Sequence, residues 1–224
     1  DLHSFPTRRS SDLEPVAVAG TLGETWKRRP SSRIAVAAAA LLTVIGLALI
    51  GKGLAIHAKA LLAQYLLEQA FAKSVATGQP VKAWSWADTW PVARLEVPRL
   101  GVSAIVLHGA SGEALAFGPG HVDGTPEPGE RGTSVIAAHR DTQFSFLRDL
   151  RHGDRIRLTR SDGAILWFRV AETDVVQWDA SGIDPDADGH WLALATCWPL
   201  DAVTAGDQRY VVRATMIGRA LPGE

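Results

Sequence analysis

The chain has 224 residues, with 23 basic and 24 acidic side chains and a net charge of −1. This length suits one globular domain with an appendage, and the balanced charge offers no basic excess for nucleic acid, so no nucleic-acid partner is expected. Cys197 is the only cysteine. A disulfide within one copy of the chain is therefore excluded, as is a zinc site built on paired cysteines.

The first thirteen residues, DLHSFPTRRSSDL, resemble the translation of a common sequencing-adapter oligonucleotide, and no methionine precedes them. We expect residues 1–13 to be an artefact joined to a gene fragment, and set them aside from the fold. The alternative is a genuine polar arm, which would carry no function that its residues reveal. Residues 14–33 are expected to form a cytoplasmic N-terminal segment.

An uncharged apolar run follows from residue 34 to residue 51. As a helix it would be about 27 Å long, enough for the hydrocarbon core of a bilayer. Residues 27–33 carry four basic side chains, whereas residues 52–59 carry two lysines. This bias predicts a signal anchor in the inner (cytoplasmic) membrane, with the N-terminus in the cytoplasm and the rest of the chain periplasmic or extracytoplasmic. A cleaved signal peptide is the alternative.

Residues 52–80 are predicted to form an amphipathic stalk and a linker. Apolar side chains recur at helical spacing as far as about residue 73, with Lys, Gln and Glu between them. The apolar face is expected to pack on the membrane surface or on the following domain. The polar, turn-rich stretch 76–83 then favours a linker.

Residues 81–219 have the pattern of an all-β domain. Seven short apolar or alternating runs are separated by glycines, and only residues 111–118 and 144–150 favour short helices. Short strands at this spacing predict a closed β-barrel or a sandwich. The expected strands are 93–100, 103–107, 133–138, 154–159, 164–173, 191–196 and 209–217.

The lone thiol of Cys197 closes the apolar run WLALATCWPL. A single buried cysteine usually serves as a small apolar side chain, so its surroundings decide whether Cys197 is structural or reactive. A thiol nucleophile needs a partner such as an imidazole to generate the thiolate. His139 is the best candidate, because it ends an apolar strand and is followed at once by polar residues. His121, in the glycine-rich turn GPGHVDGT, is more suited to shaping a groove or holding a loop.

Several of these stretches, taken in order, resemble a sortase over about residues 84–217. They are WSWADTWPVARLEVPRLG, the segment AFGPGHVDGTPEPGERGTSVIAAHRDTQFSFLRDLRHGDRIRL, then LALATCWPL and QRYVVRA. The resemblance is strongest to the membrane-anchored sortases of Gram-negative bacteria. The family's Thr-Leu-x-Thr-Cys motif reads Ala193-Leu194-Ala195-Thr196-Cys197, so its first threonine is replaced here. Thr133 stands where the family often has asparagine.

The resemblance implies a closed sortase-like β-barrel of seven to eight strands with short helices, preceded by one transmembrane helix. It also implies that Cys197 is the nucleophile, His139 the general acid, and Arg209 the donor to the substrate backbone or the oxyanion. Thr196, His121 and Asp141 would bind substrate or support the site. Arg213 lies four residues beyond Arg209 on the same face, and the period of a strand alone cannot separate the two.

The implied activity is that of a cysteine transpeptidase or endopeptidase. It would cleave the Thr–Gly bond of an LPxTG-like sorting signal on a secreted protein, form a thioacyl-enzyme and transfer the protein to an amine acceptor. No metal or organic cofactor is expected, and Asp184, Asp186 and Asp188 are interpreted as a solvated turn rather than a calcium site. A non-catalytic membrane-anchored β-domain and an L,D-transpeptidase are the alternatives; the latter's Ser-x-Gly-Cys context is missing here.

Overall fold

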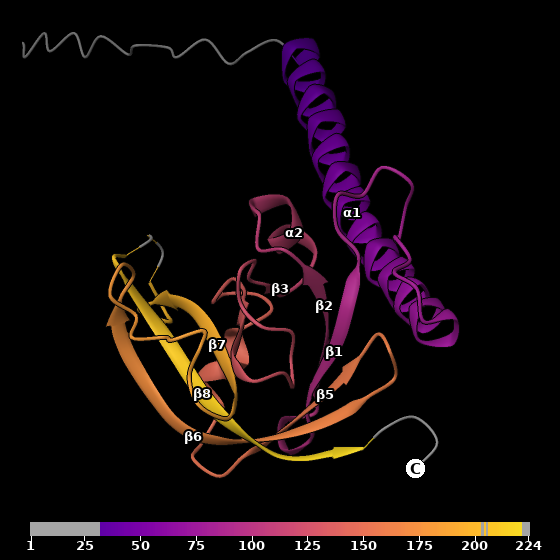
Figure 1. Cartoon of the computed structure of the whole chain (residues 1–224). Coiled ribbons are helices and arrows are strands. Elements are labelled where there is room, and N and C mark those ends of the chain that lie inside the picture. The colour runs from indigo at the N-terminus through magenta and orange to yellow at the C-terminus, as the bar shows by residue number, and fades with distance from the viewer. Residues whose placement is uncertain (1–31, 203, 205, 221–224) are drawn as a thin grey trace, which may run out of the picture. The chain divides into compact units, whose positions relative to one another are not determined.

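In a computed structural model, which describes residues 32–202, 204 and 206–220, eight strands close into a barrel (Figure 1). The barrel order is β1-β2-β3-β4-β7-β8-β6-β5. The strands are β1 (Pro91–Val97), β2 (Val102–His108), β3 (Gly120–His121), β4 (Gly132–Ala137), β5 (Arg155–Arg160), β6 (Ile165–Gln177), β7 (His190–Trp198) and β8 (Gln208–Ala220). The predicted adapter-like segment lies outside the described residues.

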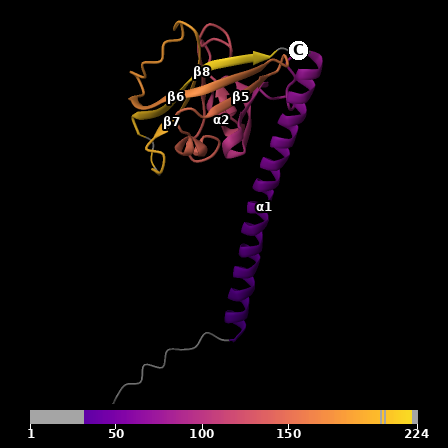
Figure 2. The ribbon, with the colours of Figure 1, turned by 90° about the horizontal axis from the view of Figure 1, so that it is seen from below.

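Alternation along the strands fills the barrel with apolar side chains. Leu192 and Leu194 of β7 and Val212 of β8 belong to this interior core and are fully buried. The long strands β6 and β8 are paired antiparallel and lie side by side along one wall in both views (Figures 1 and 2). β7 pairs parallel with β4 on one side and antiparallel with β8 on the other, which creates the three-stranded face that carries the candidate site.

The predicted closed barrel is confirmed, with differences in its short elements. β3 was not expected, because a two-residue strand held between β2 and β4 is too short to show a period. The helix expected at 144–150 is a 3₁₀-helix, η2 (Ser145–Asp149), and a second one, η1 (Pro98–Leu100), follows β1. Helix α2 (Gly112–Phe117) begins where it was predicted, with the Ser111 hydroxyl accepting a hydrogen bond from the Ala114 amide at 3.2 Å.

The chain divides into two compact units, residues 1–50 and 51–224, and helix α1 (Ser32–Thr77) contributes to both. In the first unit, its large apolar side chains from Ile34 to Ile50 are exposed. α1 is long and apolar enough to cross a membrane, and among the described residues it is the one helix with that property. This N-terminal apolar helix is a candidate membrane anchor.

In the second unit, the last turns of α1 pack on the barrel. Leu67 and Phe71 are buried in a small apolar cluster that includes Ile105 and Leu107 of β2. Glu68 also forms an ion pair with Arg94 of β1. Only the last turns of the predicted stalk contact the domain that follows, because Leu61, Leu62 and Tyr65 on its expected apolar face are exposed.

Candidate active site

Cys197 lies at the penultimate position of β7 with its side chain half-buried. Because Leu192 and Leu194 point into the core, the odd-numbered residues of β7 point outward. Ala193 and Ala195 form a small outer cluster with Val135 of β4 and Val211 of β8. The thiol therefore stands at the end of a row of small side chains, on the outer face of the barrel and within reach of a ligand.

His139 lies two residues beyond the end of β4 and is exposed. β4 and β7 are parallel, with Ala137 opposite Ala195, and the Ala138 amide donates to the Ala195 carbonyl at 3.2 Å. Continuing this register by two residues brings His139 beside Cys197. In that extension of the register, the backbones of His139 and Cys197 would lie about one strand spacing apart, or roughly 4.8 Å.

Arg209 is the direct cross-strand partner of Cys197 in the β7–β8 pair. Its guanidinium Nη1 donates to the carbonyls of Gly206 at 2.9 Å and Gln208 at 2.8 Å, which folds the side chain onto the loop before β8. Cys197 of β7 and Arg209 of β8 thus lie directly opposite each other, and His139 follows the end of the neighbouring strand β4. Such an arrangement can hold a thiolate between a proton donor and a planar hydrogen-bond donor.

Arg213, the alternative to Arg209, has different surroundings. It lies opposite Ala193, four residues from Cys197 along β7, or about 13 Å. Its Nη1 pairs with the Glu172 carboxylate at 3.2 Å and also with that of Asp174, both on β6. The alternation of a strand put Arg209 and Arg213 on the same face and could not distinguish them. The pairing of β8 with β7 does, because it sets only Arg209 opposite Cys197.

The three residues predicted to support the site differ in what they contact. Thr196 is 3% exposed, and its hydroxyl donates to the Ala138 carbonyl at 2.7 Å, directly before His139. His121 is buried in β3, where its ring Nε2 hydrogen-bonds the Pro126 carbonyl at 2.9 Å and so holds the turn before β4. Asp141 is exposed, and no hydrogen bond or ion pair joins its side chain to any other residue that the structure describes.

Two arginines that the sequence did not single out hold the loop between β7 and β8. Arg140, next to His139, is only 8% exposed, and its Nη2 donates to the Thr204 carbonyl at 2.7 Å. Arg148 of η2 donates to the Leu200 carbonyl at 3.1 Å. The segment after His139 is thereby fastened to the loop after Cys197. In the sequence, the only sign of the Arg140 contact was that Arg140 directly follows His139.

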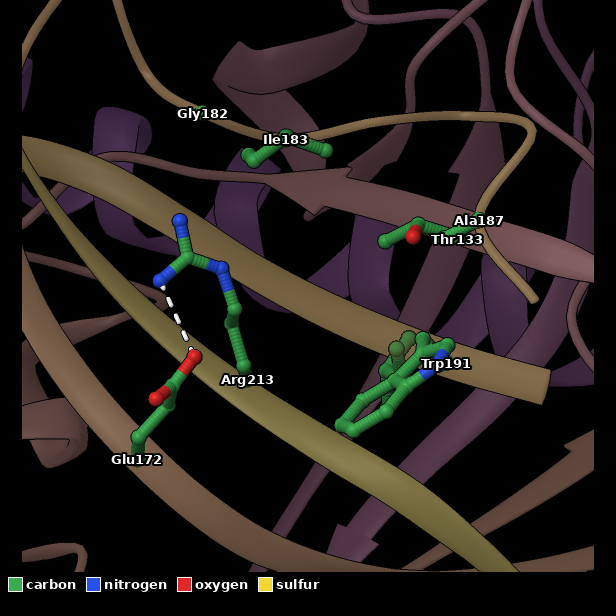
Figure 3. A pocket seen from close by; sticks show the side chains of 8 residues that line it. Thr133, Glu172, Gly182, Ile183, Ala187, Trp191 and Arg213 are labelled. Carbon is green, nitrogen blue, oxygen red and sulfur yellow. Dashed lines mark hydrogen bonds and ion pairs between the residues drawn. The ribbon is translucent and has the colours of Figure 1, made fainter. Parts of the chain in front are cut away.

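A pocket of about 380 Å³ opens on the same outer face, at the level of Ala193. Figure 3 shows Arg213 and Trp191 on one side of it, with Ile183 and Ala187 of the β6–β7 loop on the other. The loop is fastened to β4 because the Thr133 amide donates to the Pro185 carbonyl at 3.0 Å. The pocket therefore continues the face that carries Cys197.

Gly132 allows the β6–β7 loop to come this close to β4. Its φ of 108° lies in the left-handed region, and a Cβ at this position would be 2.0 Å from the Pro185 carbonyl oxygen. Its amide donates to the Gly189 carbonyl at 2.8 Å. Any larger residue would push the loop outward and open the pocket.

The acidic turn in this loop has local partners. The Asp184 carboxylate accepts from the Asp186 amide at 3.0 Å, and Asp188 pairs with Arg131. Within the described part of the chain, no group of three or more His, Cys, Asp or Glu side chains could hold a metal ion.

The fold and this face define a closed β-barrel protein with Cys197 opposite Arg209 on β7 and β8 and with His139 just beyond the end of β4. Residues 95–217, more than half of the chain, match the family model of the sortase domain. The chain belongs to the sortase family, whose members are cysteine transpeptidases.

Individual relatives agree with this assignment. The chain is 31% identical to sortase D of Bacillus subtilis (strain 168) over 118 aligned residues. The aligned region covers 53% of this chain and 60% of that protein. The chain thus matches less than two thirds of that relative's length.

Two solved structures are also similar. The sortase D5 transpeptidase of Clostridium perfringens shares the fold, with a TM-score of 0.55 at 22% identity over 70% of this chain and 96% of the other. Sortase C-1 of Actinomyces oris has a TM-score of 0.51 at 26% identity over 57% and 75% of the two chains.

Proposed function

We propose that this protein is a membrane-anchored cysteine transpeptidase that cleaves an LPxTG-like sorting signal and transfers the resulting acyl group to an amine. The observation that supports the proposal is that Arg209 lies opposite Cys197 in the β7–β8 pair, while His139 follows β4, which pairs parallel with β7. Its second support is membership of the sortase family.

In this mechanism the Cys197 thiolate attacks the carbonyl carbon of the Thr–Gly bond and forms a tetrahedral intermediate. Arg209 releases its loop carbonyls and donates to the oxyanion or to the neighbouring substrate backbone. His139, as imidazolium, protonates the leaving nitrogen, the C–N bond breaks, and a thioacyl-enzyme remains. A neutral amine then attacks the thioester, His139 takes its proton, and the thiolate leaves with the C–S bonding pair.

The pocket beside Arg213 suits the first residues of the sorting signal. An extended peptide rises about 3.3 Å per residue, so the Leu of an LPxT segment lies about 10 Å before the Thr at the scissile bond. The pocket lies about 13 Å from Cys197 along β7 and offers Ile183, Ala187 and Trp191 to apolar side chains. Leu and Pro are therefore the residues we assign to it.

The partners follow from this chemistry and from helix α1. The donor would be a secreted protein with a C-terminal LPxTG-like signal, and the acceptor an amine at the cell envelope. α1 would anchor the protein in the inner membrane, with the N-terminus in the cytoplasm and the barrel on the periplasmic or extracytoplasmic side. Residues 81–219 would form the catalytic domain, and residues 52–80 its stalk and linker.

Mass spectrometry of the detergent-solubilised full chain with a Leu-Pro-Ala-Thr-Gly peptide and triglycine tests the proposal. We expect a thioester adduct on Cys197 and a product in which triglycine replaces the terminal glycine. A peptide with the same residues in scrambled order, and the Cys197→Ala variant, should give neither. A peptide cut at the same rate by Cys197→Ala would contradict the assignment of the nucleophile.

A further inference from the structure

The first half of the predicted stalk carries an apolar row that faces solvent. Leu54, Leu61 and Tyr65 of α1 are 65%, 73% and 61% exposed, and Ala58 between them is exposed as well. We call these four residues the outer stripe. Single exposed apolar side chains are common on protein surfaces, but several that adjoin on one face of a helix indicate a surface that binds a partner.

The spacing of the outer stripe is that of a coiled-coil seam. Its members are separated by four, three and four residues, which is the alternation of the a and d positions of a heptad. Leu54 and Leu61 take d positions, and Ala58 and Tyr65 take a positions. Leucine at d is typical of parallel two-stranded coiled coils. The pattern therefore favours a second helix of the same sequence as the partner.

The barrel packs on another side of the helix and leaves the outer stripe free. Ala63, Leu67 and Ala70 are buried. Ala63 and Ala70 take f positions, which lie opposite the seam of a coiled coil. Because two residues along a helix correspond to a turn of about 200°, Ala63 points away from both Leu61 and Tyr65. Two copies can therefore pair through their outer stripes with their barrels facing outward.

The charged side chains of this stretch also lie away from the outer stripe. Lys52 comes two residues before Leu54, and Lys59 comes two residues before Leu61. Each lysine therefore points about 160° away from the leucine that follows it. Ile56 lies on the same side as the two lysines and is exposed there. The two sides of the helix thus differ, with a continuous apolar row on one and mixed residues on the other.

The bilayer is the other candidate to cover the outer stripe, and the length of the helix disfavours it. The uncharged run 34–51 already spans about 27 Å, close to the thickness of a hydrocarbon core. The outer stripe then lies roughly 5–21 Å beyond the end of that run, after Lys52. At this height a straight helix has left the hydrocarbon and has only headgroups, water or protein as neighbours.

We propose that the outer stripe is an interface between two copies of this chain, which pair in parallel along α1. Two heptads bury little surface, so they would hold a dimer weakly in free solution. A shared membrane would confine both copies to one plane and one orientation, which raises their effective concentration. The inference therefore rests on the proposed membrane anchoring and is independent of the transpeptidase reaction.

Disulfide crosslinking of the full chain in isolated membranes tests the pairing. A Cys197→Ala background makes each introduced cysteine the only thiol. Leu54→Cys and Leu61→Cys place it at d positions, where two parallel copies meet. Ile56→Cys and Lys59→Cys are the matched controls, because both positions are exposed and each lies two residues from a d position. On mild oxidation we expect covalent dimers to form at least about fivefold faster at the two d positions.

A charge on the outer stripe provides a second measurement. Leu61→Glu would bring two carboxylates together at the seam, so the crosslink at Leu54→Cys should fall to the rate of Ile56→Cys. Lys59→Glu, on the far side of the helix, should leave that crosslink unchanged. Both substitutions are at exposed positions, so thermal unfolding of the barrel should not change and serves as the folding control.

Equal rates at all four cysteine positions would overturn the proposal, because random encounters in the membrane would then account for the crosslinks. Absence of a dimer at both d positions, or a Leu54→Cys crosslink that persists with Leu61→Glu, would overturn it too and would point to lipid or an unlike partner. Recovery of the chain outside the membrane fraction would reject the anchor and the proposal with it. Loss of peptide cleavage, by contrast, bears only on the transpeptidase function.

Discussion

Removing the Thr196 hydroxyl should weaken both the barrel and the chemistry. This hydroxyl is almost fully buried and donates to the Ala138 carbonyl across 58 residues of sequence, immediately before His139. Thr196→Val keeps the shape of the side chain but leaves that carbonyl without this donor. A lost hydrogen bond of this kind costs about 1–2 kcal/mol, which corresponds to a fall in Tm of roughly 3–8 °C.

The same change frees the backbone that carries the imidazole. A misplacement of about 1 Å can cost up to about 10²-fold in rate, so we expect acylation to slow by about tenfold or more. Thermal unfolding followed by circular dichroism and the rate of thioester formation measure the two effects. Thr196→Ser, which keeps the hydroxyl, should recover most of both.

Thr173→Val provides the matched control, since Thr173 is exposed on β6, and its unfolding free energy should change by no more than about 0.5 kcal/mol. A Thr196→Val protein that melts and acylates like its parent would show that the hydroxyl does not hold His139 in place.

Other predictions concern the nucleophile, the arginines, the stalk and acid stability. Cys197→Ala should abolish thioester formation and change the unfolding free energy by less than about 1 kcal/mol, as urea titration would show. Arg209→Ala should slow peptide cleavage by about 10²- to 10³-fold and Arg213→Ala by less than about tenfold; the reverse order would refute the β8 assignment. Removing the first 80 residues should expose the apolar patch that α1 covers and promote aggregation in light scattering, whereas removing only the first 50 should not. The Arg99 guanidinium, whose Nε and Nη2 donate to Asp154 at 2.6 Å, lowers the pKa of that carboxyl. The contribution of this ion pair to stability is therefore present above about pH 4 and lost as the pH falls through the lowered pKa, so Asp154→Asn should weaken the pH dependence of the unfolding free energy below about pH 4.

The sequence was sufficient to predict the barrel because its strands alternate and its turns carry glycine. It also singled out Cys197 and His139 as candidates, since both end apolar runs. It did not reveal their adjacency, which depends on parallel pairing between β4 and β7, far apart in the chain. Parallel pairs leave no local turn signal, because their connection is a long crossover.

The two arginines of β8 show the same limit. Strand period placed them on one face, and only the register with β7 set Arg209 opposite Cys197 and Arg213 opposite Ala193. Arg140 was passed over because a buried arginine is rare, and nothing in the local pattern indicated that its guanidinium would reach the β7–β8 loop. These are tertiary contacts, which local periodicity does not encode.

The parallel pairing of β4 with β7 also bears on when the protein becomes reactive. Between these strands the chain forms β5 and β6, which pair elsewhere in the barrel. Closing so long a connection carries an entropic cost and makes such contacts late events in folding. In the proposed mechanism, Cys197 depends on the His139 imidazole, and before the barrel closes it would be an ordinary thiol. On that proposal, a chain that crossed a membrane unfolded would lack transpeptidase activity in transit and would gain it only after folding at its destination.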